Sequence, residues 1–302
     1  MAVDISKLKR HHTAVEDNYR WAAFEPRPND IFVCTPPKCG TTWTQTIVAS
    51  LLWPAGDQPD DIGKLSPWID AKFMPAEAVH AVLQAQTHRR FIKTHTPADG
   101  IPWYDEAKYI VVARDGRDAF MSMCNHMERM SEQMKAGLNE QVKDDPDVML
   151  LPQWTGDIHG FFKIWLNSNW GVMDFVQTYW PRRHQNNILF VHYNDLKADL
   201  SGEMKRIANF LSIDVPAALW DATVERCTFE AMRNDEKRLG NFAVFEGGVK
   251  GFFFKGTNGR WRDVLAPGEL AEFDAKVASV MSPDAAQWMT HGRAKLAGAA
   301  NR

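Results

Sequence analysis

The chain has 302 residues, of which 45% are hydrophobic and 24% charged, and its formal net charge is −3. This length can bury a large core in one α/β domain or in two smaller ones, and no linker sequence favours two. The small net charge gives no indication of nucleic acid or a membrane surface as partner, so an anion site would depend on a local concentration of Lys and Arg. We therefore expect a single domain over residues 1–302.

The cysteines and the termini indicate the compartment. Four cysteines lie far apart without a C-x-x-C pair, which fits a reducing compartment and argues against a disulfide framework or a zinc knuckle. No apolar segment of signal-peptide length begins the chain, and no run approaches the roughly 18 residues of a membrane span. We expect a soluble, cytoplasmic protein. Residues 1–29 are predicted to be an N-terminal arm near a pocket, and residues 283–302 a frayed tail.

The stretch from Asp30 to Trp53 predicts a strand, a loop and a helix. Its first apolar residues, IFVC, are typical of a strand, and two prolines end them. Gly40 allows a close turn, and the threonines after it favour a helix start, beyond which apolar residues recur at helical spacing. The free N–H groups of a helix N-terminus attract an anion, and Lys38 adds positive charge. This stretch therefore predicts a site for a phosphate or sulfate ester.

Three more strands are predicted, at residues 89–95 (RRFIKTH), 108–113 (KYIVVA) and 187–192 (NILFVH). Helices are expected at residues 77–86, 119–130, 161–180, 199–211 and 267–281. Continuous apolar strands that alternate with helices are typical of a parallel sheet buried on both faces. In such sheets the ligand crevice lies beyond the carboxyl ends of the strands, where the loop around Gly40 and the segment Lys93-Thr94-His95 would both emerge.

The anion site does not have the spacing of an ATP site. The lysine of G-x-x-x-x-G-K-[ST] follows a glycine directly, whereas Lys38 precedes Gly40 by two residues. The third strand runs into Arg114 instead of an acidic residue that would hold Mg²⁺, so its tip offers positive charge to an anion. The alternative is that Arg114 and Arg117 only pair with neighbouring aspartates at a helix start.

Five motifs of the cytosolic sulfotransferases have counterparts here, in the same order: PKCGTTW, KTHTP, VARDGRDAFMS, an adenine-binding pair and GFFFKGTNGRW. The pair consists of YNDL, which follows a strand, and CTFEAM, and these segments resemble the two that contact the adenine in the family. The resemblance covers about residues 20–270 and suggests a bacterial-type member. It implies a sulfotransferase fold, an α/β domain with a P-loop-kinase-like core. It also implies transfer of the sulfuryl group of 3′-phosphoadenosine 5′-phosphosulfate (PAPS) to a hydroxyl or amine of a small acceptor, without a metal. The product would be 3′,5′-adenosine diphosphate (PAP).

The resemblance implies a role for each matching residue. His95 would be the general base, and Lys38 and Lys93 would stabilise the charge that grows on the leaving oxygen, so that no covalent intermediate is required. The residues expected to bind PAPS are Lys38, Cys39, Gly40, Thr41, Thr42, Trp43, Arg114, Ser122, Tyr193, Cys227, Phe229, Phe254, Lys255 and Gly256.

The chain departs from the family pattern at several positions. Phe254 stands where the family has an arginine on the 3′-phosphate, and losing one charge-assisted contact typically costs about 1.5–3 kcal/mol. Arg260 or Arg262 is expected to compensate, or else PAPS binds more weakly. Cys227 replaces a threonine and Asn194 an acidic residue. The family's short dimer motif is not matched after GRW, so the prediction of monomer or dimer stays open.

Cys39 has two interpretations. A thiol at a helix N-terminus beside a lysine could have a lowered pKa and be open to oxidation. The favoured interpretation is a passive small residue in place of serine or threonine.

The acceptor site is less defined. Twelve tryptophans and seventeen phenylalanines suggest an apolar or aromatic alcohol, phenol or amine. The residues expected to line its pocket are Trp21, Phe24, Trp68, Phe73, Phe242 and Phe245. Met127, Met130 and Met134 would form either a helix face against the core, which we favour, or part of a mobile lid.

Two other functions remain as alternatives. One is a small-molecule kinase on the same core, which would bind ATP with Mg²⁺. The other is a nucleotide-binding relative with little or no catalysis, which the loss of an arginine at Phe254 would favour.

Overall fold

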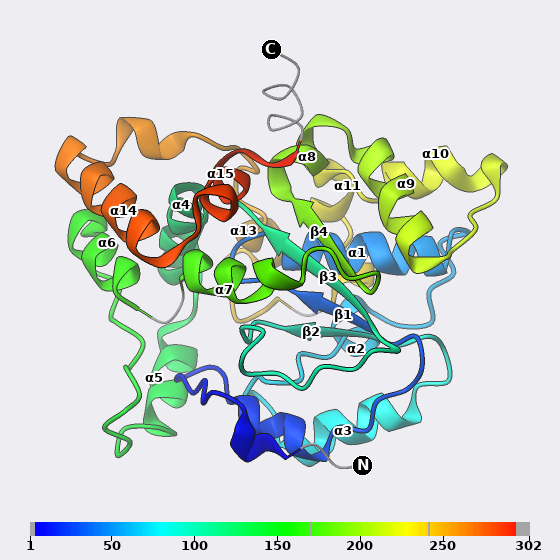
Figure 1. Ribbon diagram of the computed structural model, residues 1–302, viewed down its shortest axis with the longest axis horizontal. Helices are drawn as coiled ribbons and strands as arrows, with labels where there is room; N and C mark the ends of the chain where they lie inside the picture. The colour runs from blue at the N-terminus through cyan, green and yellow to red at the C-terminus, as the bar shows by residue number, and fades with distance from the viewer. Residues whose placement is uncertain (1–3, 169–170, 241, 294–302) are drawn as a thin grey trace.

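Four parallel strands form the central sheet in the computed structural model, which describes residues 4–168, 171–240 and 242–293. They are β1 (Ile31–Cys34), β2 (Phe91–Thr94), β3 (Lys108–Ala113) and β4 (Ile188–His192), in the spatial order β2-β1-β3-β4 (Figure 1). In register, Ile31 lies beside Phe91 on one side and beside Lys108 on the other. All pairings are parallel, so the predicted parallel α/β sheet is confirmed.

Helices surround this sheet. Their bounds are α1 (Thr41–Leu52), α2 (Ile62–Leu65), α3 (Ala76–Ala85), α4 (Gly116–Arg129), α5 (Glu132–Glu140), α6 (Ile158–Leu166), α7 (Val172–Tyr179), α8 (Tyr193–Ala198), α9 (Leu200–Leu211), α10 (Ala217–Glu225), α11 (Phe229–Arg233), α12 (Glu236–Leu239), α13 (Gly248–Phe252), α14 (Pro267–Val280) and α15 (Pro283–His291). Short 3₁₀ helices occupy Ile5–Lys7, Asn18–Ala23, Trp180–Arg182 and Arg260–Asp263. In the described residues, no helix is both long and apolar enough to cross a membrane.

The sheet is buried on both faces because its strands carry apolar residues on both sides. On one face Ile31 and Ile110 pack with α1 and α9. On the other, Phe32, Tyr109 and Val111 pack with α3 and α7. A third cluster, beyond the end of β3, joins α4 and α6 to α14 and α15. Figure 1 shows α7 on the near side of the sheet and α1 on the far side.

The segment predicted as one helix over 161–180 forms two. Helix α6 ends at Leu166 with Asn167 as its C-cap, and α7 begins after Gly171, whose backbone is extended. Residues 169 and 170 lie outside the described residues. The amphipathic pattern continues through the break, so the apolar spacing alone did not reveal it.

The C-terminal segment also differs from the prediction of a frayed tail. Residues 283–291 form α15, whose Trp288 packs against Trp180 and Phe190 with ring centroids 5.4 and 5.2 Å apart. His192 Nε2 donates a hydrogen bond to the carbonyl of Met289 over 2.9 Å. Buried aromatic contacts and this bond hold the helix on the domain. The rest of the predicted tail, residues 294–302, lies outside the described residues.

The N-terminal arm is anchored at two places. Trp21 and Phe24 are buried against Phe32 of β1, with ring centroids 5.4 and 5.8 Å from it. Nearer the start, Glu16 forms a β-bridge with Ala71, which brings this part of the arm beside the loop before α3. Residues 15 and 16 of the arm therefore lie beside this loop.

Candidate active site

The loop between β1 and α1 has a constrained shape. Lys38 and Gly40 both lie in the left-handed region, with φ of +66° and +106°. A Cβ on Gly40 would lie 3.1 Å from the ring of Tyr193, so this position favours glycine for both conformation and space. No side chain caps the N-terminus of α1. Its first N–H groups and the positive end of its dipole are therefore available to an anion.

A cavity of about 600 Å³ lies next to this loop. Its wall includes residues that follow each strand of the sheet: Pro37 after β1, His95 after β2, Arg114 after β3 and Tyr193 after β4. The predicted crevice beyond the carboxyl ends of the strands is therefore present.

Three groups of residues line the cavity. We call the first the loop side: Lys38, Gly40, Thr41, Thr42, Trp43, Arg114, Ser122, Tyr193, Phe229, Phe254, Lys255, Gly256 and Arg260. We call the second the arm side: Val15, Glu16, Trp68, Phe73, Met127, Met130, Met134, Leu151, Phe242, Phe245 and Phe252. Lys93, His95 and His126 lie where the two sides meet, and Lys38 reaches them from the loop.

Two predicted PAPS-binding residues do not line the cavity. Cys39 is fully buried in the core beside α4, and burial raises the pKa of its thiol to about 12. This contradicts the hypothesis of a low-pKa thiol and leaves a passive core residue. Cys227 is also fully buried, but its carbonyl accepts a hydrogen bond from Trp43 Nε1 over 2.8 Å. Its contribution to the cavity is to hold the Trp43 ring.

Aromatic rings and one arginine form the back of the loop side. The rings of Trp43 and Tyr193 meet edge to face at 5.1 Å, and the Arg114 guanidinium lies 4.2 Å from the Tyr193 ring centroid. Phe229 approaches Gly256 so closely that a Cβ there would lie 2.8 Å from its ring. Trp43, Tyr193 and Phe229 all line the cavity and form an aromatic slot beside a cation, which suits a purine base next to a phosphate.

Arg114 is held by the loop that follows Gly256. Its Nη2 donates to the carbonyl of Thr257 and its Nε to Oδ1 of Asn258, both over 3.1 Å. Asn194, which stands where the family has an acidic residue, accepts from Asn258 in turn over 2.5 Å. The alternative of a local ion pair holds instead for Arg117, whose guanidinium lies 2.7 Å from Asp115.

Cations surround Phe254. The guanidinium of Arg260, the guanidinium of Arg129 and the ammonium of Lys255 lie 5.6, 5.3 and 5.0 Å from its ring centroid. Arg260 lines the cavity, and its Nε is buried without a hydrogen-bond partner in the described residues. Burial, followed by the charge of Arg114, lowers the pKa of Arg260, which indicates that cations gather around Arg260. Arg262 instead packs over Trp261 at 4.5 Å and does not line the cavity.

His95 is buried where the two sides meet. Its Nδ1 lies within hydrogen-bond distance of the Thr35 carbonyl, and since a carbonyl only accepts, Nδ1 carries the proton. Nε2 is then the basic nitrogen. Burial, followed by the charge of Lys93, holds the pKa of His95 well below its usual value. The ring also meets Trp68 edge to face at 4.6 Å, which fixes its orientation.

Two lysines lie beside this histidine. Lys93 Nζ is 3.6 Å from the Trp68 ring centroid, and burial lowers its pKa to about 8 although Glu16 and Asp70 oppose the shift. Burial lowers the pKa of Lys38 to about 7, and the charge of Lys93 acts in the same direction. An anion bound between them would restore both charges.

The arm side contains four of the six predicted pocket residues: Trp68, Phe73, Phe242 and Phe245. Trp21 and Phe24 do not belong to it, because they pack on Phe32 in the core cluster of β1, α3 and α7. Met127 of α4, its C-cap Met130 and Met134 of α5 line the cavity, and Met127 and Met130 are also buried. The predicted single helix face is therefore divided between two helices, and its methionines serve both the core and the pocket.

Several lining residues were not predicted from the sequence. His126 is one helical turn after Ser122 on α4, so the i, i+4 spacing from a predicted residue was a usable signal. Glu16 is the one acidic residue among the described lining residues, and burial raises its pKa to about 8. Val15 and Phe252 had no local signal, since they reach the cavity only through tertiary packing.

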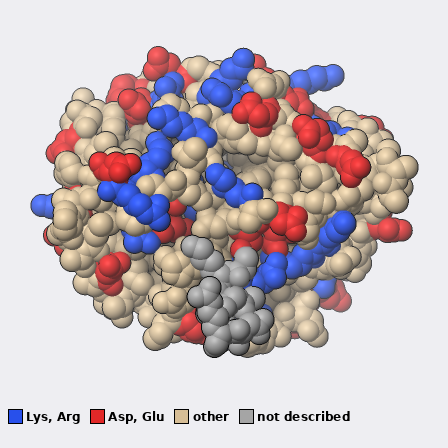
Figure 2. Space-filling model, turned by 90° about the horizontal axis from the view of Figure 1, so that it is seen from above, with Lys and Arg blue, Asp and Glu red and all other residues tan. Residues whose placement is uncertain are grey.

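Figure 2 shows the molecule from above, the face toward which β3 and β4 run in Figure 1. The surface is hollowed near the centre of this view, and Lys and Arg side chains gather beside the hollow. Although the chain is slightly acidic overall, basic side chains gather beside this hollow, with acidic side chains elsewhere on the same face.

Comparisons with known proteins agree with this geometry. A family model described as a sulfotransferase domain matches residues 28–288. The chain is 31% identical to a glycolipid sulfotransferase of Mycobacterium bovis, with 94% of each chain covered. It is 26% identical to sulfotransferase 1C2 of Homo sapiens, with 86% of each covered.

Solved structures share the fold. A mouse sulfotransferase complexed with PAP has a TM-score of 0.67 at 22% identity, over 90% of this chain and 91% of that one. Retinol dehydratase in complex with androsterone and PAP has a TM-score of 0.63 at 21% identity, over 86% and 82%. The resemblance found in the motifs is thereby confirmed, and the chain belongs to the sulfotransferase family.

Proposed function

We propose that this sulfotransferase takes its sulfuryl group from PAPS and passes it to a hydroxyl, or an amine, of an acceptor with an apolar body, with His95 as the general base. One observation carries the proposal. The basic Nε2 of His95, the lysines Lys38 and Lys93 and the uncapped N-terminus of α1 all belong to one cavity. A base, positive charge and an anion site are the three requirements of sulfuryl transfer to a hydroxyl.

The residues on the loop side fit PAPS. The N-terminus of α1 with Lys38 suits the 5′-phosphosulfate, and the slot of Trp43, Tyr193 and Phe229 suits the adenine. The absence of a side chain at Gly40 lets the Tyr193 ring pack directly against this loop. PAPS supplies an activated sulfuryl group with a phosphate leaving group.

The chain's own residues then have separate tasks. His95 is held by Thr35 and Trp68 in the tautomer that accepts a proton at Nε2. In their charged forms, Lys38 and Lys93 place positive charge where the leaving oxygen becomes negative, and their attraction for that oxygen is strong because little water screens it. A hydroxyl nucleophile that loses its proton to His95 needs no covalent enzyme intermediate.

Arg260 and Arg114 bind the 3′-phosphate of PAPS. Arg260 lines the cavity with an unpartnered Nε, and Ser122 lies on the same wall. Arg260 follows Phe254 by six residues, yet the turn at Gly256 and Gly259, both with positive φ, brings its guanidinium back to 5.6 Å from the Phe254 ring centroid. Of the two arginines expected to compensate for Phe254, the geometry favours Arg260.

The acceptor is proposed from the arm side. Phe73, Phe242 and Phe245, together with the three methionines, offer an apolar and adaptable surface beside His95. The relatives in Mycobacterium are named glycolipid sulfotransferases. A hydroxylated acceptor with a lipid-like or aromatic body fits both observations.

The test has two arms. Calorimetry with PAP should show saturable binding, and transfer from ³⁵S-labelled PAPS to a panel of phenols, steroids and glycolipids should label at least one acceptor, with or without a chelator. No PAP binding, or activity lost with the chelator, would overturn the proposal. Binding of ATP with Mg²⁺ in place of PAP would favour the kinase alternative. Tight PAP binding without transfer to any acceptor would favour the non-catalytic relative.

A further inference from the structure

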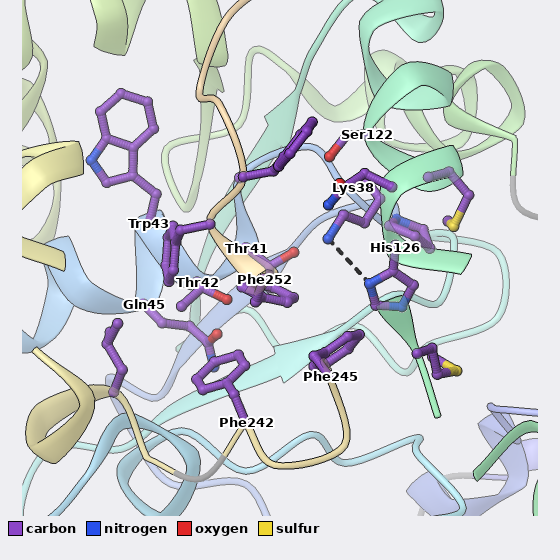
Figure 3. Close-up of a pocket in the computed structure, with 18 of the residues that line it drawn as sticks. Lys38, Thr41, Thr42, Trp43, Gln45, Ser122, His126, Phe242, Phe245 and Phe252 are labelled. Carbon is purple, nitrogen blue, oxygen red and sulfur yellow. Dashed lines mark hydrogen bonds between the residues drawn. The ribbon is translucent and has the colours of Figure 1, made fainter. Parts of the chain in front are cut away.

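His126 contacts the lysine of the anion-binding loop. It lies on α4, and its Nδ1 is 3.3 Å from Lys38 Nζ (Figure 3). Its ring packs on Phe245 and Phe252, with centroids 4.8 and 6.2 Å apart. Lys38 Nζ also lies 4.1 Å from the centroid of the Phe252 ring. The ammonium thus lies among aromatic rings, with one imidazole nitrogen in hydrogen-bond range.

Lys38 has no acidic partner in the described residues. The charged side chains that act on it most strongly, Lys93 of β2 and Arg114 beyond β3, are both cations, and the thiol of Cys39 opposes them only weakly. No carboxylate lies within salt-bridge distance of its Nζ in the described part of the chain. The lone pair of His126 Nδ1 is therefore the side-chain acceptor available to this half-buried ammonium.

The contact determines the tautomer of His126. An ammonium only donates, so Nδ1 must carry a lone pair and Nε2 the proton. The groups that face His126 are Lys38, Lys93, His95 and Lys135 of α5, and all of them disfavour its charge. Burial acts in the same direction, so its pKa lies well below the usual value. His126 is neutral at physiological pH and has the opposite tautomer to His95.

We propose that His126 is a positioning residue that holds the Lys38 ammonium by accepting its hydrogen bond, and so keeps the loop lysine charged and aligned for the sulfuryl donor. The proposal rests on the proposed function, because Lys38 is taken to serve the phosphosulfate. Without this acceptor the half-buried ammonium would have no side-chain hydrogen-bond partner in the described residues, and the neutral amine would be favoured.

A consequence follows for ligand binding. The pKa of Lys38 is lowered to about 7 in the structure without ligand, and an anion beside it raises that pKa. Near neutral pH the charged and the neutral form of Lys38 are then both present, and the molecules with a neutral Lys38 take up a proton when PAP binds. His126 sets the fraction of molecules that are already charged.

The first test is made on the protein without ligand. The Lys38 signal of ¹³C-lysine-labelled protein, assigned with Lys38→Met, is titrated by NMR. His126→Phe retains a ring against Phe245 and Phe252 but removes the acceptor. In this variant the titration midpoint of Lys38 should move to lower pH by about 0.5–1 unit, which corresponds to the free energy of one hydrogen bond.

Two further variants make the NMR test specific. His126→Gln restores an acceptor oxygen and should bring the midpoint back toward that of the wild type. His88→Phe is the matched control, because His88 also packs on an aromatic ring, that of Trp53 at 5.1 Å, but does not line the cavity. A midpoint of Lys38 that is unchanged in His126→Phe would overturn the proposal, whether or not PAP binds.

The second test measures PAP binding against pH. With the Lys38 midpoint lowered in this way, the His126→Phe variant should bind PAP about three- to eightfold more weakly than the wild type at pH 7.5. At pH 6 the difference should be less than about twofold, because Lys38 is mostly charged at that pH in both proteins. A change confined to the acceptor KM, equal at both pH values, would overturn the proposal and make His126 an acceptor contact instead. Failure of the wild type to bind PAP would count against the proposed function alone.

Discussion

The two sides of the cavity are built in different ways. The loop side takes most of its residues from short motifs in which a strand end, a turn and a helix start follow one another, as at Gly40 and Arg114. The arm side gathers Val15, Phe73, Met130 and Phe245 from segments far apart in the chain. Changes on the loop side should therefore affect nucleotide binding, and changes on the arm side the choice of acceptor. Substitutions on each side, and at the residues where the sides meet, test this division.

Replacing His95, where the two sides meet, should have the largest effect. His95→Ala should lower kcat by about 10²–10⁴-fold, the usual worth of a general base, and leave the PAP affinity near that of the wild type. Single-turnover kinetics and calorimetry on the same preparation would show the two results. Turnover at the wild-type rate would mean that another residue takes the proton.

On the loop side, Arg260→Ala should weaken PAP binding by about 10–100-fold, the worth of one charge-assisted contact. Binding of adenosine 5′-monophosphate, which lacks the 3′-phosphate, should change little. Arg262→Ala is the matched control, because Arg262 does not line the cavity.

Phe254→Arg in the Arg260→Ala background should recover part of the loss. If Arg260→Ala weakened the binding of PAP and of adenosine 5′-monophosphate equally, Arg260 would support the fold or contact the adenine. If Arg262→Ala weakened PAP binding more than Arg260→Ala, Arg262 would be the residue that binds the 3′-phosphate.

The pH dependence of activity should distinguish the titration of His95 from that of Lys38 and Lys93. The pKa of His95 lies well below 6.5, so His95 is already basic at neutral pH and gives no loss of activity there. The pKa values of Lys38 and Lys93 are lowered to about 7 and about 8, and binding needs their charged forms. The value of kcat/KM for PAPS should therefore fall as pH rises through about 7 to 8. A flat profile from pH 6 to 9 would contradict the shifted lysines.

On the arm side, the smallest effect is expected from Phe73, whose side chain is half exposed at the cavity wall. Phe73→Ala should raise the acceptor KM about fivefold, the worth of a partly buried ring, and leave the KM for PAPS unchanged. Steady-state kinetics with both substrates varied would show it. A matching rise in the KM for PAPS would mean that the two sides are coupled.

The same division explains what could be predicted from the sequence. The strands and the loop around Gly40 follow from local patterns, because residues near one another in a motif stay near one another in the fold. The resemblance to the sulfotransferase motifs supplied most of the other residues on the loop side. Local spacing also placed Cys39 at the anion site. It could not show that the Cys39 side chain turns into the core while the neighbouring Lys38, in a left-handed conformation, turns into the cavity.

The arm side could be predicted only in part, because it depends on long-range packing. The β-bridge between Met130 and Phe245 joins the end of α4 to a segment more than a hundred residues later, and no local pattern indicates that pairing. Composition suggested Trp21 and Phe24 as pocket residues, but it cannot distinguish an aromatic side chain in a pocket from one in the core. Their contacts with Phe32 put them in the core.

Helix α15 has a consequence for truncated forms of this protein. His192 donates from Nε2 to the carbonyl of Met289 in α15, and its Nδ1 accepts from the backbone N–H of Asn194 over 3.1 Å. Tyr193, whose ring packs against Gly40, is therefore steadied by a helix whose described residues contribute no side chain to the cavity. A truncation after Met281 should loosen the adenine slot from a distance, whereas an affinity tag fused after Arg293 leaves this support in place.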